Sequence, residues 1–88
     1  MKKNYKDALS EVVAINDSVA SVIGTNKGYY YDLCLIKAAQ SLKSKLISDY
    51  DLQRSELEKL TDRLNRLIGE ADTRVFNALY PNTMGVRV

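Results

Sequence analysis

Apolar residues recur every three or four positions between Asn4 and Ile23, a spacing typical of one buried face of an α-helix. The repeat runs through Tyr5, Leu9, Val12, Val19 and Ile23, with Ala8, Ile15 and Val22 widening the stripe. Gly24 follows the last periodic residue, where helices often end in a left-handed glycine. Residues 25–28 have the composition of a turn. The pattern therefore predicts a first helix over about 4–23, roughly 30 Å long.

A second apolar stripe begins after this turn. Its members are Leu35, Ala39, Leu42, Leu46, Tyr50, Gln53, Leu57, Leu60, Leu64, Leu67 and Ala71, at steps of three or four. From Leu46 onward the spacing is that of a heptad repeat, with leucine at four consecutive core positions. The four-residue step from Leu46 to Tyr50 shifts the phase of the repeat. Residues 48–51 have the lowest helix propensity of the region, although they include neither Gly nor Pro. The pattern predicts either one helix over about 29–79 or two helices separated near 48–51.

Pro81 disfavours helical angles at Tyr80, so the helical region is expected to end there. In the last eight residues Met84, Val86 and Val88 alternate with other residues, which predicts a short extended tail. We therefore expect one helical domain over 1–80 and a tail over 81–88. The predicted fold class is all-α: a helical hairpin with a long second helix, or a three-helix arrangement if that helix breaks, with a coiled-coil-like leucine seam.

Charged residues and one glycine add local predictions for the second helical region. Glu70 lies four residues before Arg74, a spacing that predicts a stabilising pair on the outer face. Gly69 predicts either a point of reduced stability in the helix or a close contact between helices. Asp49 and Asp51 are expected to cap a helix start if the chain breaks beside them.

The leucine seam predicts association between chains. If 29–79 were unbroken, the first helix would cover less than half of it, and each exposed leucine would cost about 1.5–3 kcal/mol. Pairing with a second copy or a partner avoids this cost, as does a break into three helices, and we favour association. The expected oligomer or partner contacts are Leu57, Leu60, Leu64, Leu67 and Tyr50, with Tyr29, Tyr30, Tyr31, Phe76 and Tyr80 as secondary candidates.

Three consecutive tyrosines, Tyr29 to Tyr31, follow the turn. Successive side chains on a helix point about 100° apart, so the three phenols cover more than half of the circumference. One or two of them can pack against the first helix. At least one is therefore expected to point toward solvent or a partner.

The chain lacks the residues on which most enzymes and metal sites depend. It has no histidine and one cysteine, Cys34, which excludes His-based catalytic triads and thiolate-rich metal clusters. Cys34 is flanked by leucines and is expected to be a packed structural thiol. No phosphate-binding glycine loop is present. We expect a non-enzymatic protein without a cofactor or metal.

The net charge of +2 is too small for the basic field of a typical DNA-binding domain. No apolar run approaches the length of a membrane span or a signal-peptide core, so a cytoplasmic protein is expected.

The predicted function is a self-associating helical interaction module of structural, adaptor, chaperone or inhibitor type. Small helical hairpins of this kind occur among phage and secretion-system accessory proteins, and the likeness is one of architecture only. Nucleic-acid binding by the 27–45 segment is the alternative, because its lysines, at 27, 37, 43 and 45, accompany tyrosines that could stack on bases.

Overall fold

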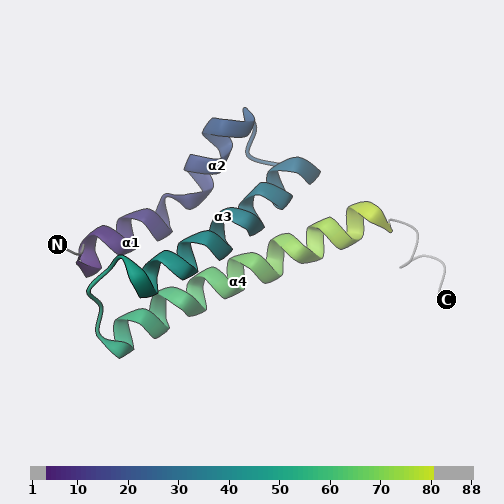
Figure 1. Cartoon of the computed structure of the whole chain (residues 1–88). Coiled ribbons are helices and arrows are strands. Elements are labelled where there is room, and N and C mark those ends of the chain that lie inside the picture. The colour runs from purple at the N-terminus through teal and green to yellow at the C-terminus, as the bar shows by residue number, and fades with distance from the viewer. Residues whose placement is uncertain (1–3, 81–88) are drawn as a thin grey trace.

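The computed structural model describes residues 4–80, which form four helices and no strand (Figure 1). They are α1 (Tyr5–Val13), α2 (Ile15–Ile23), α3 (Tyr29–Ser48) and α4 (Arg54–Leu79). The predicted all-α class is confirmed. The molecule is elongated, with principal extents of 53 × 29 × 16 Å. The tail predicted over 81–88 lies outside the described residues.

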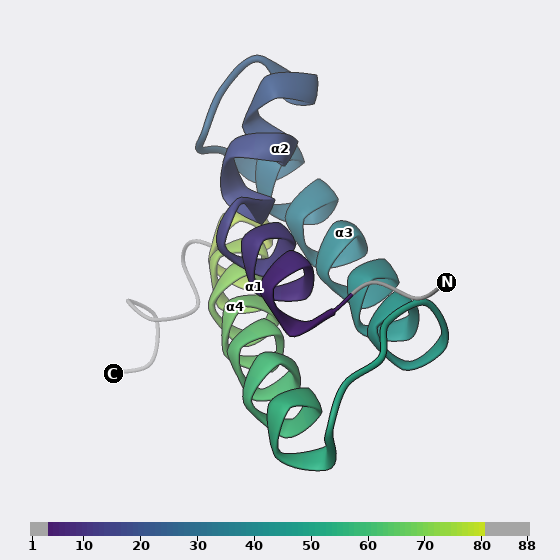
Figure 2. The ribbon, with the colours of Figure 1, turned by 90° about the vertical axis from the view of Figure 1, so that its left-hand side faces the viewer.

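The first helical region is divided at Ala14, where a single helix over 4–23 was predicted. Ala14 has φ −88° and ψ 1°, and hydrogen bonds still pass across it, because its N–H donates to the Ser10 carbonyl at 3.0 Å. Its carbonyl accepts from the Ser18 N–H at 2.9 Å. The chain therefore bends here rather than unwinding. The bend allows α1 to pack against α4 while α2 follows α3 (Figure 1 and Figure 2).

The second helical region is broken, as one of the two sequence interpretations predicted. α3 ends at Ser48 and α4 begins at Arg54. The start of α4 is fixed by a reciprocal cap, in which the Gln53 side chain accepts from the Glu56 N–H and the Gln53 N–H donates to Glu56 Oε1 at 2.9 Å. The expectation that Asp49 and Asp51 cap this helix is wrong, because Gln53 occupies the cap position. Asp49 instead closes α3 through its N–H, which donates to the Lys45 carbonyl at 2.7 Å.

The break allows α4 to fold back beside α3 in the opposite direction, so that the leucine stripe is covered within one chain. Lys43 Nζ donates to Asn65 Oδ1 at 2.6 Å, and Asp32 near the start of α3 meets Arg74 near the end of α4. The largest side chains in the resulting core are Leu35 and Leu46 from α3, Leu60 and Leu64 from α4, and Val12 from α1. Because the chain breaks, the cost of leaving these leucines exposed does not arise.

Two glycines should respond in opposite directions to the same substitution. Gly69 lies inside α4, which continues through it without a break. A Cβ added at Gly69 would meet nothing within 4 Å, so the glycine marks neither a break in the helix nor a close contact between helices. Gly24 ends α2 with φ 91°, where a side chain is strained. We expect Gly69→Ala to raise the free energy of unfolding by about 0.5–1 kcal/mol. Gly24→Ala should lower it by about 1–2 kcal/mol.

Urea unfolding followed by circular dichroism would measure both effects, each variant serving as the control for the other. A loss of stability in Gly69→Ala would contradict the open environment described for this position.

Candidate interaction surface

Exposed large apolar side chains collect at one end of the elongated molecule. Among the described residues, six of the eight such side chains lie where α2 ends, α3 begins and α4 ends, the region we name the aromatic end (residues 22–33 and 75–80). The six are Val22, Tyr30, Leu33, Phe76, Leu79 and Tyr80, while Val13 and Ile47 lie elsewhere. Figure 1 shows the turn between α2 and α3 and the last turn of α4 in the same half of the molecule.

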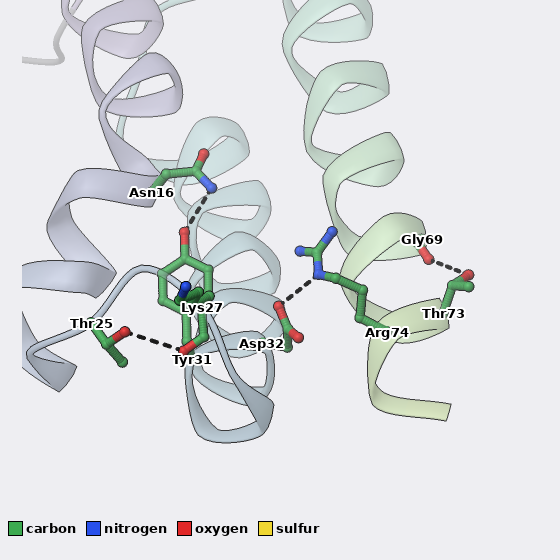
Figure 3. Close-up of polar contacts among 8 residues, drawn as sticks. All are labelled: Asn16, Thr25, Lys27, Tyr31, Asp32, Gly69, Thr73 and Arg74. Atoms are coloured by element: carbon green, nitrogen blue, oxygen red, sulfur yellow. Dashed lines mark hydrogen bonds and ion pairs between the residues drawn. The ribbon is translucent and has the colours of Figure 1, made fainter. Parts of the chain in front are cut away.

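An ion pair joins the parts of this end that are distant in sequence. Asp32 in the first turn of α3 is only 5% exposed, and Arg74 Nε donates to its Oδ1 at 2.9 Å (Figure 3). The carboxylate also lies at a helix N-terminus, which favours negative charge. Arg74 was expected to pair with Glu70 on its own helix, and the structure instead places it across the helix interface. This contact brings the last turns of α4 beside the start of α3.

The three consecutive tyrosines point in different directions, as predicted. Tyr31 is buried, and Asn16 Nδ2 of α2 donates to its hydroxyl at 2.8 Å (Figure 3). Tyr30 is 73% exposed, and Tyr29 is partly buried with its ring edge against Tyr30, at 5.5 Å between centroids. Tyr31 therefore fixes α2 to α3, while Tyr30 is available at the surface.

The end of α4 adds a second aromatic pair. Phe76 and Tyr80 are about half exposed, and their ring centroids lie 5.0 Å apart at a tilt of 44°. Leu79 between them is 53% exposed. Aromatic rings held in this way offer large contact area at little entropic cost on binding.

The aromatic end carries little charge. Lys27 and Asp32 are its charged residues, and Asp32 is already buried against Arg74. The opposite end, formed by the start of α1, the 49–53 link and the start of α4, is dense in charge: Lys6, Asp7, Asp49, Asp51, Arg54, Glu56, Glu58 and Lys59. The molecule therefore presents one apolar and one charged end.

A small apolar cavity opens between α2 and α3 next to this end. Its volume is about 290 Å³, and its walls include Val19, Val22 and Ile23 from α2 with Cys34 and Ala38 from α3. Cys34 is partly buried here, in agreement with the packed thiol expected from the sequence. The volume falls just below the usual range for small-molecule sites, about 300–1,000 Å³. The cavity suits one apolar side chain of a binding partner.

The sequence did not single out this cavity or Val22 as part of a surface. Val22 belongs to the stripe predicted to be buried, yet it is 85% exposed. The reason is the bend at Ala14, which directs α2 along α3 and leaves the rest of its apolar face uncovered. A signal for this was absent, because the bend contains neither Gly nor Pro.

Most of the predicted primary contacts lie inside the fold. Leu60 and Leu64 are fully buried, and Leu57 and Leu67 are partly buried against the same core. A contact between copies through this seam stays a prediction, and in this conformation it could use only the exposed fractions of Leu57 and Leu67.

Tyr50, also predicted as a contact between chains, is buried in the structure and hydrogen-bonded within the chain. Its ring is buried, and its hydroxyl donates to Glu11 Oε2 of α1. Burial raises the pKa of Tyr50 to about 12, with further contributions from the hydrogen bond to Glu11 and from the charges of Glu11, Asp49 and Asp7. The interaction joins the link between α3 and α4 to the first helix.

Comparison with known proteins gave no match: no family model, no curated protein and no solved structure is similar to this chain at a significant level. No helix within residues 4–80 is both long and apolar enough to cross a membrane. Across the same residues, no three His, Cys, Asp or Glu side chains are grouped so that they could hold a metal ion.

Proposed function

We propose that this protein is a non-catalytic helical interaction module that self-associates, and that the aromatic end is its contact surface. One observation carries the proposal: six of the eight exposed large apolar side chains among residues 4–80 lie at one end of the molecule. The centres of protein interfaces are enriched in aromatic residues and depleted of charge. The aromatic end has both properties.

The size of the chain also favours association. A domain of 88 residues buries only about 60–65% of the surface that its unfolded chain exposes, so additional burial adds useful stability. Of the contacts predicted from the sequence, Tyr30, Phe76 and Tyr80 remain on the surface and are retained in the proposal. Leu60 and Leu64 would have to leave the core to reach a partner, at a cost of about 1.5–3 kcal/mol each.

Light scattering of the purified chain tests this proposal. We expect a mass above the 9.9 kDa of one chain that falls toward 9.9 kDa on dilution. Tyr30→Lys should shift the mass to that of the monomer at concentrations where the unchanged protein associates, because it places a charge within the aromatic end. Ile47→Lys is the matched control, since Ile47 is 70% exposed but lies at the other end of α3, and it should associate normally.

Circular dichroism would verify that both variants remain folded. A monomer at all concentrations, or equal effects of the two substitutions, would contradict the proposal.

Nucleic-acid binding is less well supported by the surface. Lys43 lies on a different side of α3 from Lys37 and Lys45, because each residue turns the helix by about 100° and these two are only about 80° apart. Lys43 also donates to Asn65 of α4. Two lysines on one side of a helix form too small a basic face to supply the main source of affinity for a phosphate backbone.

A further inference from the structure

We propose that α2 and the 24–28 turn form a hinged strap, which opens away from α3 about the bend at Ala14 and uncovers the cavity between the two helices. The motion takes place within one chain, so the inference goes beyond the proposed function and does not depend on it. Segments that open locally have few buried apolar contacts and few polar contacts that hold them. The strap, residues 15–28, has both properties.

The strap contributes little apolar surface to the core. Within residues 15–28 only Ile15 and Val19 are buried, whereas Val22 is 85% exposed and Ile23 is partly exposed. α3 lies between α2 and α4 (Figure 1), and α2 packs mainly against α3. The cavity of about 290 Å³ lies along this contact, so the packing between the two helices is incomplete. Separating α2 from α3 therefore exposes far less apolar surface than unfolding the whole core.

A single polar side-chain contact joins the strap to the rest of the described chain, residues 4–80. It is the hydrogen bond that Asn16 Nδ2 donates to the Tyr31 hydroxyl at 2.8 Å (Figure 3). Asn16 lies two residues after Ala14, close to the bend. The far end of α2 has no such bond to α3, so the hydrogen bond from Asn16 is the polar contact that opening has to break.

Both ends of the strap provide a pivot. At Ala14 the helical hydrogen bonds continue, from the Ala14 N–H to the Ser10 carbonyl and from the Ser18 N–H to the Ala14 carbonyl. A change of bend angle there does not require the helix to unwind. At the other end Gly24 and Gly28 have φ of 91° and 110°, and glycine reaches a wide range of backbone angles at little steric cost.

Opening of the strap changes two surfaces. It widens the cavity, whose wall on α3 includes Cys34 and Ala38. It also moves Val22 relative to Tyr30 of α3, which rearranges the exposed apolar side chains of the aromatic end. The strap therefore acts as a conformational control on the shape of both the cavity and this end of the molecule.

The thiol of Cys34 can report opening, because it is the one cysteine of the chain and is partly buried in the cavity wall next to α2. Its rate of reaction with dithiobis(nitrobenzoic acid) would be compared in two matched variants, Tyr31→Phe and Tyr50→Phe. Each variant removes the hydroxyl of a buried tyrosine and one hydrogen bond to another part of the chain. Urea unfolding would verify that both are folded and of comparable stability.

Tyr31→Phe should raise the rate about fivefold, the factor that corresponds to a net hydrogen-bond contribution of about 1 kcal/mol, because it removes the bond that holds the strap. Tyr50→Phe should leave the rate unchanged, because the hydrogen bond between Tyr50 and Glu11 persists when only the strap opens.

Two other outcomes would overturn the inference. Equal acceleration in both variants would mean that Cys34 reacts only when the whole chain unfolds. No acceleration in either would mean that Cys34 reacts without movement of α2. Self-association is read separately, from the dependence of the rate on protein concentration, so the strap and the proposed function can fail independently.

Discussion

Leu64→Ala is expected to lower the free energy of unfolding by about 3–5 kcal/mol, the range measured for leucines truncated in well-packed cores. Leu64 of α4 has no exposed surface and belongs to the core shared with α1 and α3. The substitution removes the transfer free energy of the lost atoms and leaves a cavity. Small domains have total stabilities of about 5–15 kcal/mol, so the variant should be close to unfolding at room temperature.

Urea unfolding followed by circular dichroism would measure this loss. The matched control is Ile47→Ala on α3, where the side chain is 70% exposed and lies away from the aromatic end, and the expected loss is below about 1 kcal/mol. The comparison also tests the leucine seam. If Leu64→Ala dissociated an oligomer while each chain remained as stable as Ile47→Ala, the leucines would form an interface between copies rather than the core of one chain.

Stability is expected to fall between about pH 10 and pH 12 as Tyr50 ionises. The pKa of Tyr50 is raised to about 12 in the folded chain, from 10.0 for an unperturbed tyrosine, chiefly because its ring is buried. The folded state therefore holds this proton more tightly than the unfolded state does. The stabilisation is fully present below pH 10 and is lost as the pH rises toward 12. A difference of two pKa units corresponds to about 2–3 kcal/mol.

Tyr50→Phe isolates this contribution from the lysines and other tyrosines that titrate in the same range. At pH 8 the variant should be less stable than the unchanged protein by about 1 kcal/mol, because it loses the hydrogen bond to Glu11. The difference should reverse by pH 12, because the loss on ionisation of Tyr50 exceeds the contribution of the hydrogen bond. Parallel curves of unfolding free energy against pH for the two proteins would contradict the assigned role of Tyr50.

The repeat of apolar residues was sufficient to predict helices and most of the core. Leu35, Leu46, Leu60 and Leu64 all belong to the predicted stripe, and all are buried. The left-handed glycine at the end of α2 was also predicted correctly, since Gly24 has φ 91°. These features depend on residues within one or two helical turns, so the local sequence contains the information that determines them.

The candidate surface could be predicted only in part. Tyr30, Phe76 and Tyr80 were named from the sequence because aromatic residues are common in interfaces, while Val22, Leu33 and Leu79 were not. Helical spacing alone showed that the three tyrosines must diverge. It did not show that Tyr31 would be the buried one, because that depends on the position of Asn16 on another helix.

The sequence by itself determined the helical class, the turn at 24–28 and the leucine stripe. Only the tertiary structure decided between one long helix and two, bent the first region at Ala14, and brought the apolar side chains to one end. The contacts responsible join distant residues: Tyr50 and Glu11 are 39 positions apart, and Asp32 and Arg74 are 42 apart. Such pairs form only when the helices are already side by side, so no local sequence pattern predicts them.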